Sequence, residues 1–477
     1  MMDSLRRLPL PRNLWAWVMV LVVLLGTAFL GAHPSVLWIA LFVAAAGAAI
    51  LLRQPILGLF ALVVAALMVP LEFGTGTEVR INLAVMLPPA LVGVWVLDRA
   101  RRHDPLVIPP SKVNIPLWLL LLAGLLSLVI GNATWDPAVP RPNNLILVQL
   151  SQWAIFAFSA AVFWLMGSLV NKETWLSRLT FFYLVVAGAQ AILRVLPGTE
   201  GIRRLVTTFA TDRAPFWLLL AALAGGQLLF NRALSTRQRW LLLLVLGAVF
   251  YYTFFLERAT ISNMAGVVPV FGMLAWLRWP RWRWVYLAAG ILVLLVFFPT
   301  IYQFAGGEAE WEESGGSRLA LAGRVIEVSM RNPVTGLGPA AYRAYARMKP
   351  LLYGRAYWLD PLINSHNNYV DLFSQLGIVG LMLFVWFSVQ AIRLGWRLHT
   401  RFTQGFAAGY VNAMLAAWVG SLVVMLFADW ILPFVYNIGF PGFQASVLVW
   451  LFLGGLVSLD QMARRELDVE EANATTD

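Results

Sequence analysis

The stretch from Asn364 to Trp396, NSHNNYVDLFSQLGIVGLMLFVWFSVQAIRLGW, joins a short polar cluster to a long apolar run. A helix needs about 20 apolar residues to cross a hydrocarbon layer roughly 30 Å thick, so this run is long enough to do so. Comparable runs recur along the 477 residues of the chain. Because lipid offers no hydrogen-bond partner to the backbone, such runs must form helices. The sequence therefore predicts an all-α polytopic membrane protein.

The apolar segments give a count of 12–14 transmembrane helices. Short neighbouring segments that merge or re-enter the membrane would give the lower number. The first segment lacks a small-residue cleavage site, so we interpret it as a span and not as a secretory signal. The chain has no cysteine, which excludes a disulfide framework and thiolate metal ligands. The candidate spans are 14–31, 36–52, 55–71, 80–98, 115–131, 146–170, 175–196, 214–230, 240–255, 261–277, 284–300, 369–396, 405–428 and 443–459.

Basic residues indicate the orientation of these spans. One alternating set of loops carries 21 of the 35 Lys and Arg residues, and basic residues concentrate on the cytoplasmic side. Both termini are then cytoplasmic, and the net charge of +11 needs no nucleic-acid partner. We expect N-terminal transmembrane helices in 1–200, central helices with outward arginines in 201–300, a periplasmic loop with short helices in 301–367, C-terminal transmembrane helices in 368–459 and a cytoplasmic tail in 460–477.

The outward loops retain basic residues that are almost all arginine. A guanidinium group presents a planar fork of donors that suits phosphate, so several such groups together would hold a diphosphate. Arg258 lies in a very short connection, where it either faces a polar cavity or pairs with Glu257. The arginines form three groups: Arg203, Arg204 and Arg213; Arg258; and Arg318, Arg324, Arg331, Arg343, Arg347 and Arg355.

The long outward loop contains the run GGSRLALAGRVIEVSMRNP, residues 315–333, which predicts a short helix along the membrane interface. Arg324 and Arg331 would share one face of this helix, and Arg318 would project from its first turn. For Arg331, Arg347 and Arg355 we favour solvation or contact with lipid headgroups. The GLGPAAY that follows predicts a turn. The expected apolar face consists of Leu319, Val325, Ile326 and Met330.

Two further polar clusters each have two interpretations. The acidic run GGEAEWEESGG, residues 306–316, lacks metal-ligand spacing, so a solvated loop is favoured over a divalent-metal site. His366 lies at the end of the long outward loop, where Ser365 or Asn367 can cap the next helix. Its imidazole is either a general base for an acceptor hydroxyl or a hydrogen-bonded interfacial side chain.

Four stretches resemble segments of a known family. His366-Asn367, nine residues, then GIVG is similar to the His-Asn/Ser/Gln, x9, Gly-x-x-Gly signature of the O-antigen ligase family. FLERATISNMAGVVPVFGML, SRLALAGRVIEVSMRNPVTGLGPAAYR and, more loosely, RRLVTTFATDRAPFWLLL resemble other segments of the ligase and polymerase domain. Glu257-Arg258-Ala259 departs from the family's Ser-Arg-Gly.

The resemblance implies a glycosyltransferase type C fold in the bacterial inner membrane, with a periplasmic active site. It implies transfer of a glycan from undecaprenyl diphosphate to lipid A-core, with no metal, nucleotide sugar or other cofactor. The expected partners are the lipid-linked glycan donor, the lipid A-core acceptor and membrane lipids. The expected roles are catalysis by His366, diphosphate binding by Arg258, Arg318, Arg324 and Arg204, and support by Asn367, Gly377 and Gly380.

Two other functions remain open at this point. An O-antigen polymerase uses the same donor but passes the glycan to another lipid-linked repeat, and its acceptor groove cannot be recognised in the sequence. A polysaccharide or lipid transporter would show internal repeats and charges near the membrane midplane. Neither feature is evident in this chain.

Overall fold

The computed structural model describes residues 36–74, 80–257, 260–304, 316–348 and 365–474. The chain divides into two units, 1–55 and 56–477. The described part of the first unit contains one helix, α2 (Val36–Arg53). The predicted span 14–31, Arg258 and the acidic residues 308–313 lie outside the described residues.

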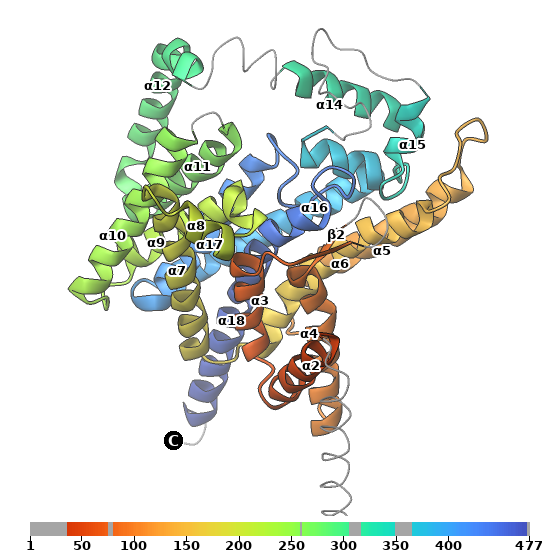
Figure 1. Cartoon of the computed structure of the whole chain (residues 1–477). Coiled ribbons are helices and arrows are strands. Elements are labelled where there is room, and N and C mark those ends of the chain that lie inside the picture. The colour runs from red at the N-terminus through yellow and green to blue at the C-terminus, as the bar shows by residue number, and fades with distance from the viewer. Residues whose placement is uncertain (1–35, 75–79, 258–259, 305–315, 349–364, 475–477) are drawn as a thin grey trace, which may run out of the picture. The chain divides into compact units, whose positions relative to one another are not determined.

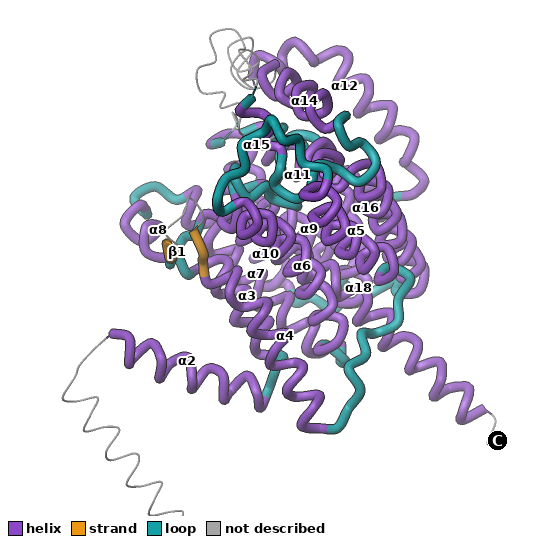
Figure 2. Tube along the Cα trace, turned by 90° about the vertical axis from the view of Figure 1, so that its right-hand side faces the viewer, coloured by secondary structure: helices purple, strands orange, loops and turns teal. Residues whose placement is uncertain are grey.

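The second unit is a helical bundle with one antiparallel hairpin, β1 (Glu72–Gly74) and β2 (Arg80–Asn82) (Figures 1 and 2). Its longer helices are α3 (Leu57–Met68), α4 (Leu83–Arg102), α5 (Asn114–Ala133), α6 (Leu145–Leu169), α7 (Glu173–Val195), α9 (Ala214–Phe230), α10 (Thr236–Tyr251), α11 (Ile261–Arg278), α12 (Arg283–Phe304), α14 (Gly316–Ser329), α16 (Asn368–Arg401), α17 (Gly405–Val424) and α18 (Gly439–Ala474). Short elements are α8 (Glu200–Val206), η1 (Phe209–Asp212), the π-helical η2 (Tyr252–Leu256), η3 (Pro280–Trp282) and α15 (Tyr342–Arg347).

Each predicted span within the described residues coincides with a helix, which confirms the all-α polytopic membrane class. In that part of the chain, eight helices are long and apolar enough to cross a membrane: α4 to α7, α10 with η2, and α16 to α18. The apolar helices α3 and α9 are shorter. A transmembrane count of 12–14 stays a prediction, as does the five-part division of the chain. Helix α18 continues beyond residue 459 into the expected tail.

The core of the second unit lies where α9, α17, α6 and α18 pack together. Helix α9 is buried almost all round, as expected for a helix that is apolar on every face. Trp217, Trp418 and Trp450 are fully buried, and the rings of the latter two meet edge to face at 5.6 Å. A side chain at Gly226 would overlap the carbonyl oxygen of Gly409, so small residues let α9 and α17 approach closely.

Polar contacts join different elements at the two ends of this bundle. At one end Trp164 donates to Asn114 (3.2 Å), and Arg397 pairs with Asp460 (2.7 Å). At the other end Thr208 donates to the carbonyl of Ala66 (2.6 Å), and Arg331 pairs with Asp136. Helices α14 and α15 lie toward the end opposite the C-terminus (Figures 1 and 2). The end at which α16 begins therefore gathers the loops that were predicted to face outward.

Helix α16 is interrupted at Gly377, whose φ is +66°. The backbone on both sides of the interruption bonds to residues 333–338: Leu337 N donates to Ser374 O (2.9 Å), and Ile378 N donates to Pro333 O (2.9 Å). A side chain at Gly377 would overlap the Val334 carbonyl, and one at Gly380 would overlap Leu376. The predicted turn at Gly336 and Gly338 is confirmed, and its backbone is hydrogen-bonded to this bend.

Helix α14 confirms the predicted helix but corrects its orientation. Arg324 was expected to share an outward face with Arg331, yet Arg324 is buried and Arg331 is 55% exposed. Of the expected apolar face, Val325 is buried, whereas Leu319, Ile326 and Met330 are exposed. The reason is that α14 packs on α16 through the side that carries Leu321, Val325 and Val328, and Arg324 lies at its edge.

Gly377→Ala should destabilise the bundle, because an alanine there adds about 1–3 kcal/mol of backbone strain as well as the overlap with Val334. Thermal unfolding in detergent, followed by size-exclusion chromatography, measures the loss. Gly247→Ala in α10 is the matched control, since a Cβ there meets open space. An equal melting temperature for the two variants would contradict a structural need for glycine at the bend.

Candidate active site

The first turn of α16 fixes the backbone around His366. The Asn367 side chain accepts from Tyr369 N (3.0 Å) and Val370 N (3.2 Å), which confirms the predicted cap. Ser365 donates through its hydroxyl (2.5 Å) and its backbone N–H (3.2 Å) to the buried carboxylate of Asp371. Between these anchors His366 adopts φ +53°, a left-handed conformation that is uncommon for residues other than glycine.

The α17–α18 connection, residues 425–438, lies against this turn. Asn368 is buried and holds it with three bonds: its Nδ2 donates to Leu432 O (2.7 Å), and its Oδ1 accepts from the backbone N–H groups of Ile431 and Leu432 (3.2 Å each). The backbone N–H of Asn368 donates to Met425 O (2.9 Å). The start of α16 and the connection therefore form one rigid unit.

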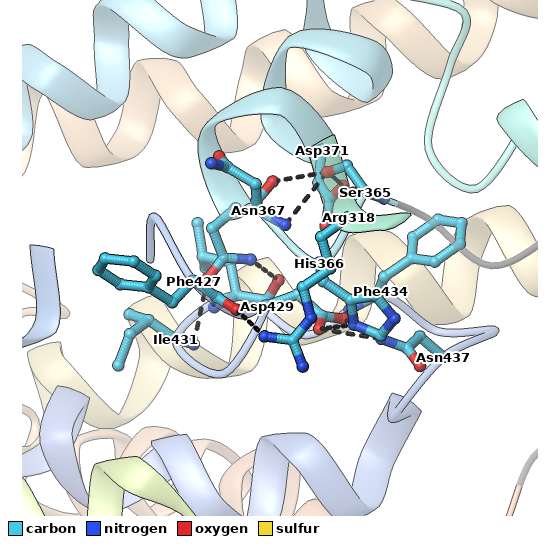
Figure 3. A network of polar contacts seen from close by, with 12 residues as sticks. Arg318, Ser365, His366, Asn367, Asp371, Phe427, Asp429, Ile431, Phe434 and Asn437 are labelled. Carbon is cyan, nitrogen blue, oxygen red and sulfur yellow. Dashed lines mark hydrogen bonds and ion pairs between the residues drawn. The ribbon is translucent and has the colours of Figure 1, made fainter. Parts of the chain in front are cut away.

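The side chains of His366, Asp429 and Asn437 meet inside this unit (Figure 3). Asn437 Nδ2 lies 2.9 Å from Asp429 Oδ1 and 3.1 Å from His366 Nδ1. His366 Nδ1 lies 3.6 Å from Asp429 Oδ1. The Asp429 side chain is 2% exposed and the His366 side chain 20%, so a buried carboxylate supports an imidazole that solvent or substrate can reach.

The tautomer of the neutral imidazole is linked to the partner of Nδ1. When Nδ1 accepts from Asn437, the ring proton lies on Nε2. When Nδ1 carries the proton, it faces Asp429 and leaves Nε2 free to accept one. The geometry thus permits proton transfer at Nε2, with Asp429 offsetting the charge that forms.

Arg318 reaches the same connection. Its Nη1 donates to the carbonyl of Phe427 (3.1 Å), two residues before Asp429 (Figure 3). The structure therefore brings Arg318 and His366, 48 positions apart in the sequence, to one short segment of backbone.

The other predicted site residues are placed less directly. Arg324 pairs with Glu327 (2.7 Å) on α14, and Arg204 is exposed on α8. Gly377 and Gly380 lie at the bend of α16, the helix that begins two residues after His366. Arg258 lies outside the described residues. Diphosphate binding by Arg258, Arg318, Arg324 and Arg204 stays a prediction.

Sequence reasoning missed Asp429 and Asn437. A single acid in the otherwise apolar connection ADWILPFVYNI was the available signal, since ionisable groups near membrane depth tend to be functional. Among the described residues, no group of three or more His, Asp or Glu side chains could hold a metal ion.

Residues 245–385 match the family model described as O-antigen ligase. Over this segment the chain is similar to the O-antigen ligase family. The matched segment contains Arg258, Arg318, Arg324 and His366, and it ends before the connection that supplies Asp429. No curated protein matches the chain.

Asp429→Asn should reduce glycan transfer about 10²-fold or more, because the imidazole loses the buried carboxylate that faces Nδ1 and orients the ring. Transfer is measured with purified protein, a lipid-linked glycan and an acceptor glycolipid. Asp104→Asn is the control: Asp104 pairs with Arg99 at the opposite end of the bundle. Undiminished transfer by the Asp429 variant would contradict the support given to His366.

Proposed function

We propose that the protein transfers a glycan from undecaprenyl diphosphate to a sugar hydroxyl of lipid A-core, without a metal ion and with inversion at the anomeric carbon. The observation that carries the proposal is the pairing of the exposed edge of His366 with buried Asp429, beside an arginine bound to the same backbone segment. The match of residues 245–385 to the O-antigen ligase family model supports a glycosyltransferase of the ligase type.

The reaction needs one bond made and one bond broken. The acceptor oxygen attacks the anomeric carbon, the bond from that carbon to the diphosphate oxygen breaks, and the diphosphate leaves with the electron pair. The hydroxyl proton passes to Nε2 of His366, which requires the tautomer with Nδ1–H facing Asp429. A positioned base of this kind contributes about 10²–10⁴-fold.

Arginines supply positive charge where the leaving diphosphate becomes more negative. In the proposal, Arg318 and Arg258 contact the phosphates, and Arg324 and Arg204 strengthen the field around them. Each donor that acts in the transition state is worth about 10²–10³-fold. Guanidinium groups stay charged in partly buried surroundings, so they can take the place of a divalent cation.

The active site faces the periplasm of a bacterial inner membrane in this proposal, with both termini in the cytoplasm. Support comes from the distribution of basic residues between the two ends of the bundle. The end opposite the site carries Arg99, Arg101 and Arg102 in the last turn of α4, and Arg278, Arg281 and Arg283 around η3.

His366→Asn should abolish ligation in cells. The matched control is His103→Asn, because His103 also has a left-handed backbone (φ +57°) and asparagine tolerates that conformation in both places. Lipopolysaccharide gels of a null strain should show ladder bands with the control and bare core with the His366 variant, while polymerised glycan stays on the lipid carrier. Core bearing a single repeat would instead identify a polymerase.

Transfer by the purified protein should persist in excess EDTA, since arginines and not a cation neutralise the diphosphate. The assay compares initial rates with and without chelator. Strong inhibition that added Mg²⁺ or Mn²⁺ reverses would refute metal independence, and the glutamates at 308–313 would become the first candidates for ligands.

A further inference from the structure

Arg213 lies between two aromatic rings at the end of the bundle where α16 begins. Its guanidinium carbon is 4.3 Å from the ring centre of Phe209 and 4.9 Å from that of Trp430. Trp430 is buried and Arg213 is half-buried. Aromatic faces attract a cation through their electron density but accept no conventional hydrogen bond from it. The two rings therefore hold the guanidinium in place and leave its N–H groups to another partner.

Within the described part of the chain, no protein group accepts a hydrogen bond from the Arg213 side chain. Its Nε is buried without a partner. The adjacent carboxylate, Asp212, pairs instead with Arg194, which is 9% exposed and also donates to Thr211 Oγ1 (2.6 Å). Asp212 is thus engaged by Arg194 and forms no hydrogen bond with the half-buried Arg213 beside it. A cation in such surroundings gains from an anion that also accepts hydrogen bonds.

The electrostatic balance around Arg213 agrees with this geometry. Burial lowers the pKa of Arg213, and so does the charge of Arg194, whereas Asp212, Tyr252 and Glu257 only partly oppose these effects. An arginine nevertheless stays protonated in proteins. The group is therefore a charged donor that lacks an acceptor, and not a neutral side chain packed between rings.

Trp430 directly follows Asp429, so Arg213 is attached to the same backbone segment as the candidate active site. Along residues 427–430, the Phe427 carbonyl binds Arg318, the Asp429 carboxylate faces His366 and the Trp430 ring covers Arg213. We propose that Arg213 binds a phosphate group of a lipid-linked substrate at this site. The chemistry fits either the diphosphate of the donor or a phosphate on the acceptor, and the identity of these lipids rests on the proposed function.

The test measures how anions stabilise the purified protein in nanodiscs. Inorganic pyrophosphate, undecaprenyl diphosphate and a phosphorylated lipid A-core are titrated separately, and the melting temperature gives an apparent affinity. Arg213→Ala should weaken binding of pyrophosphate and of one lipid about tenfold or more, the usual worth of a hydrogen bond between charged groups. Arg213→Lys should recover part of the affinity, because it keeps the charge but not the fork.

Arg331→Ala is the matched control. Arg331 also stacks on an aromatic ring, 5.4 Å from the centre of Tyr345, but it has its own carboxylate in Asp136. Its anion affinities should therefore stay at the wild-type level. The lipid whose binding falls in the Arg213 variants, donor or acceptor, identifies the source of the phosphate.

A role limited to packing gives a different result. In that case Arg213→Ala lowers the melting temperature without anion, but the shift caused by each anion stays the same. That outcome would overturn the inference, as would a wild-type protein that none of the three anions stabilises. Neither result depends on glycan transfer, so a failure here is separate from a failure of the His366 experiment.

Discussion

The candidate site depends on one buried amide, the side chain of Asn368. It joins the first turn of α16 to the α17–α18 connection, more than 60 residues further along, through three hydrogen bonds. An unmade bond to a buried polar group costs about 1–3 kcal/mol, so the two segments separate only at considerable cost. His366 precedes this amide by two residues, and Asp429 precedes Ile431 by two. The distance between imidazole and carboxylate therefore follows from the geometry of Asn368.

The bend in α16 extends this rigidity to the arginines. Residues before Gly377 belong to the site, whereas those after it continue through the bundle. The interruption leaves backbone groups of α16 without helical partners. Residues 333–338 bond to four of these groups: they donate to two carbonyls before the bend and accept from two N–H groups after it. The same residues follow α14, which carries Arg318 and Arg324. The helix that presents arginine and the helix that presents histidine thus share one junction.

The sequence was sufficient for features that depend on local pattern. Long apolar runs predicted the helices, Asn367 predicted the cap, and Gly336 with Gly338 predicted a turn that only residues tolerant of positive φ can form. It was insufficient where the partner is remote. Nothing local relates Asp429 to His366, because an isolated acid in a short connection has no periodicity. Arg324 shows the same limit: helical spacing tells which residues share a face, but not which face its neighbours cover.

The distribution of cations poses an energetic problem that the same contacts resolve. In the proposed orientation, arginines at the site end oppose the basic bias that places loops in the cytoplasm, so a stronger basic bias at the other end would have to offset them. In the described residues, several arginines at the site end are already committed to protein partners: Arg331 to Asp136, Arg194 to Asp212 and Arg324 to Glu327. Arg213 differs, because two aromatic rings hold its guanidinium group and the adjacent Asp212 pairs with Arg194. A guanidinium group whose Nε has no partner among the described residues therefore lies against Trp430. An anionic lipid headgroup would suit this guanidinium group, because its phosphate oxygens carry negative charge and accept hydrogen bonds.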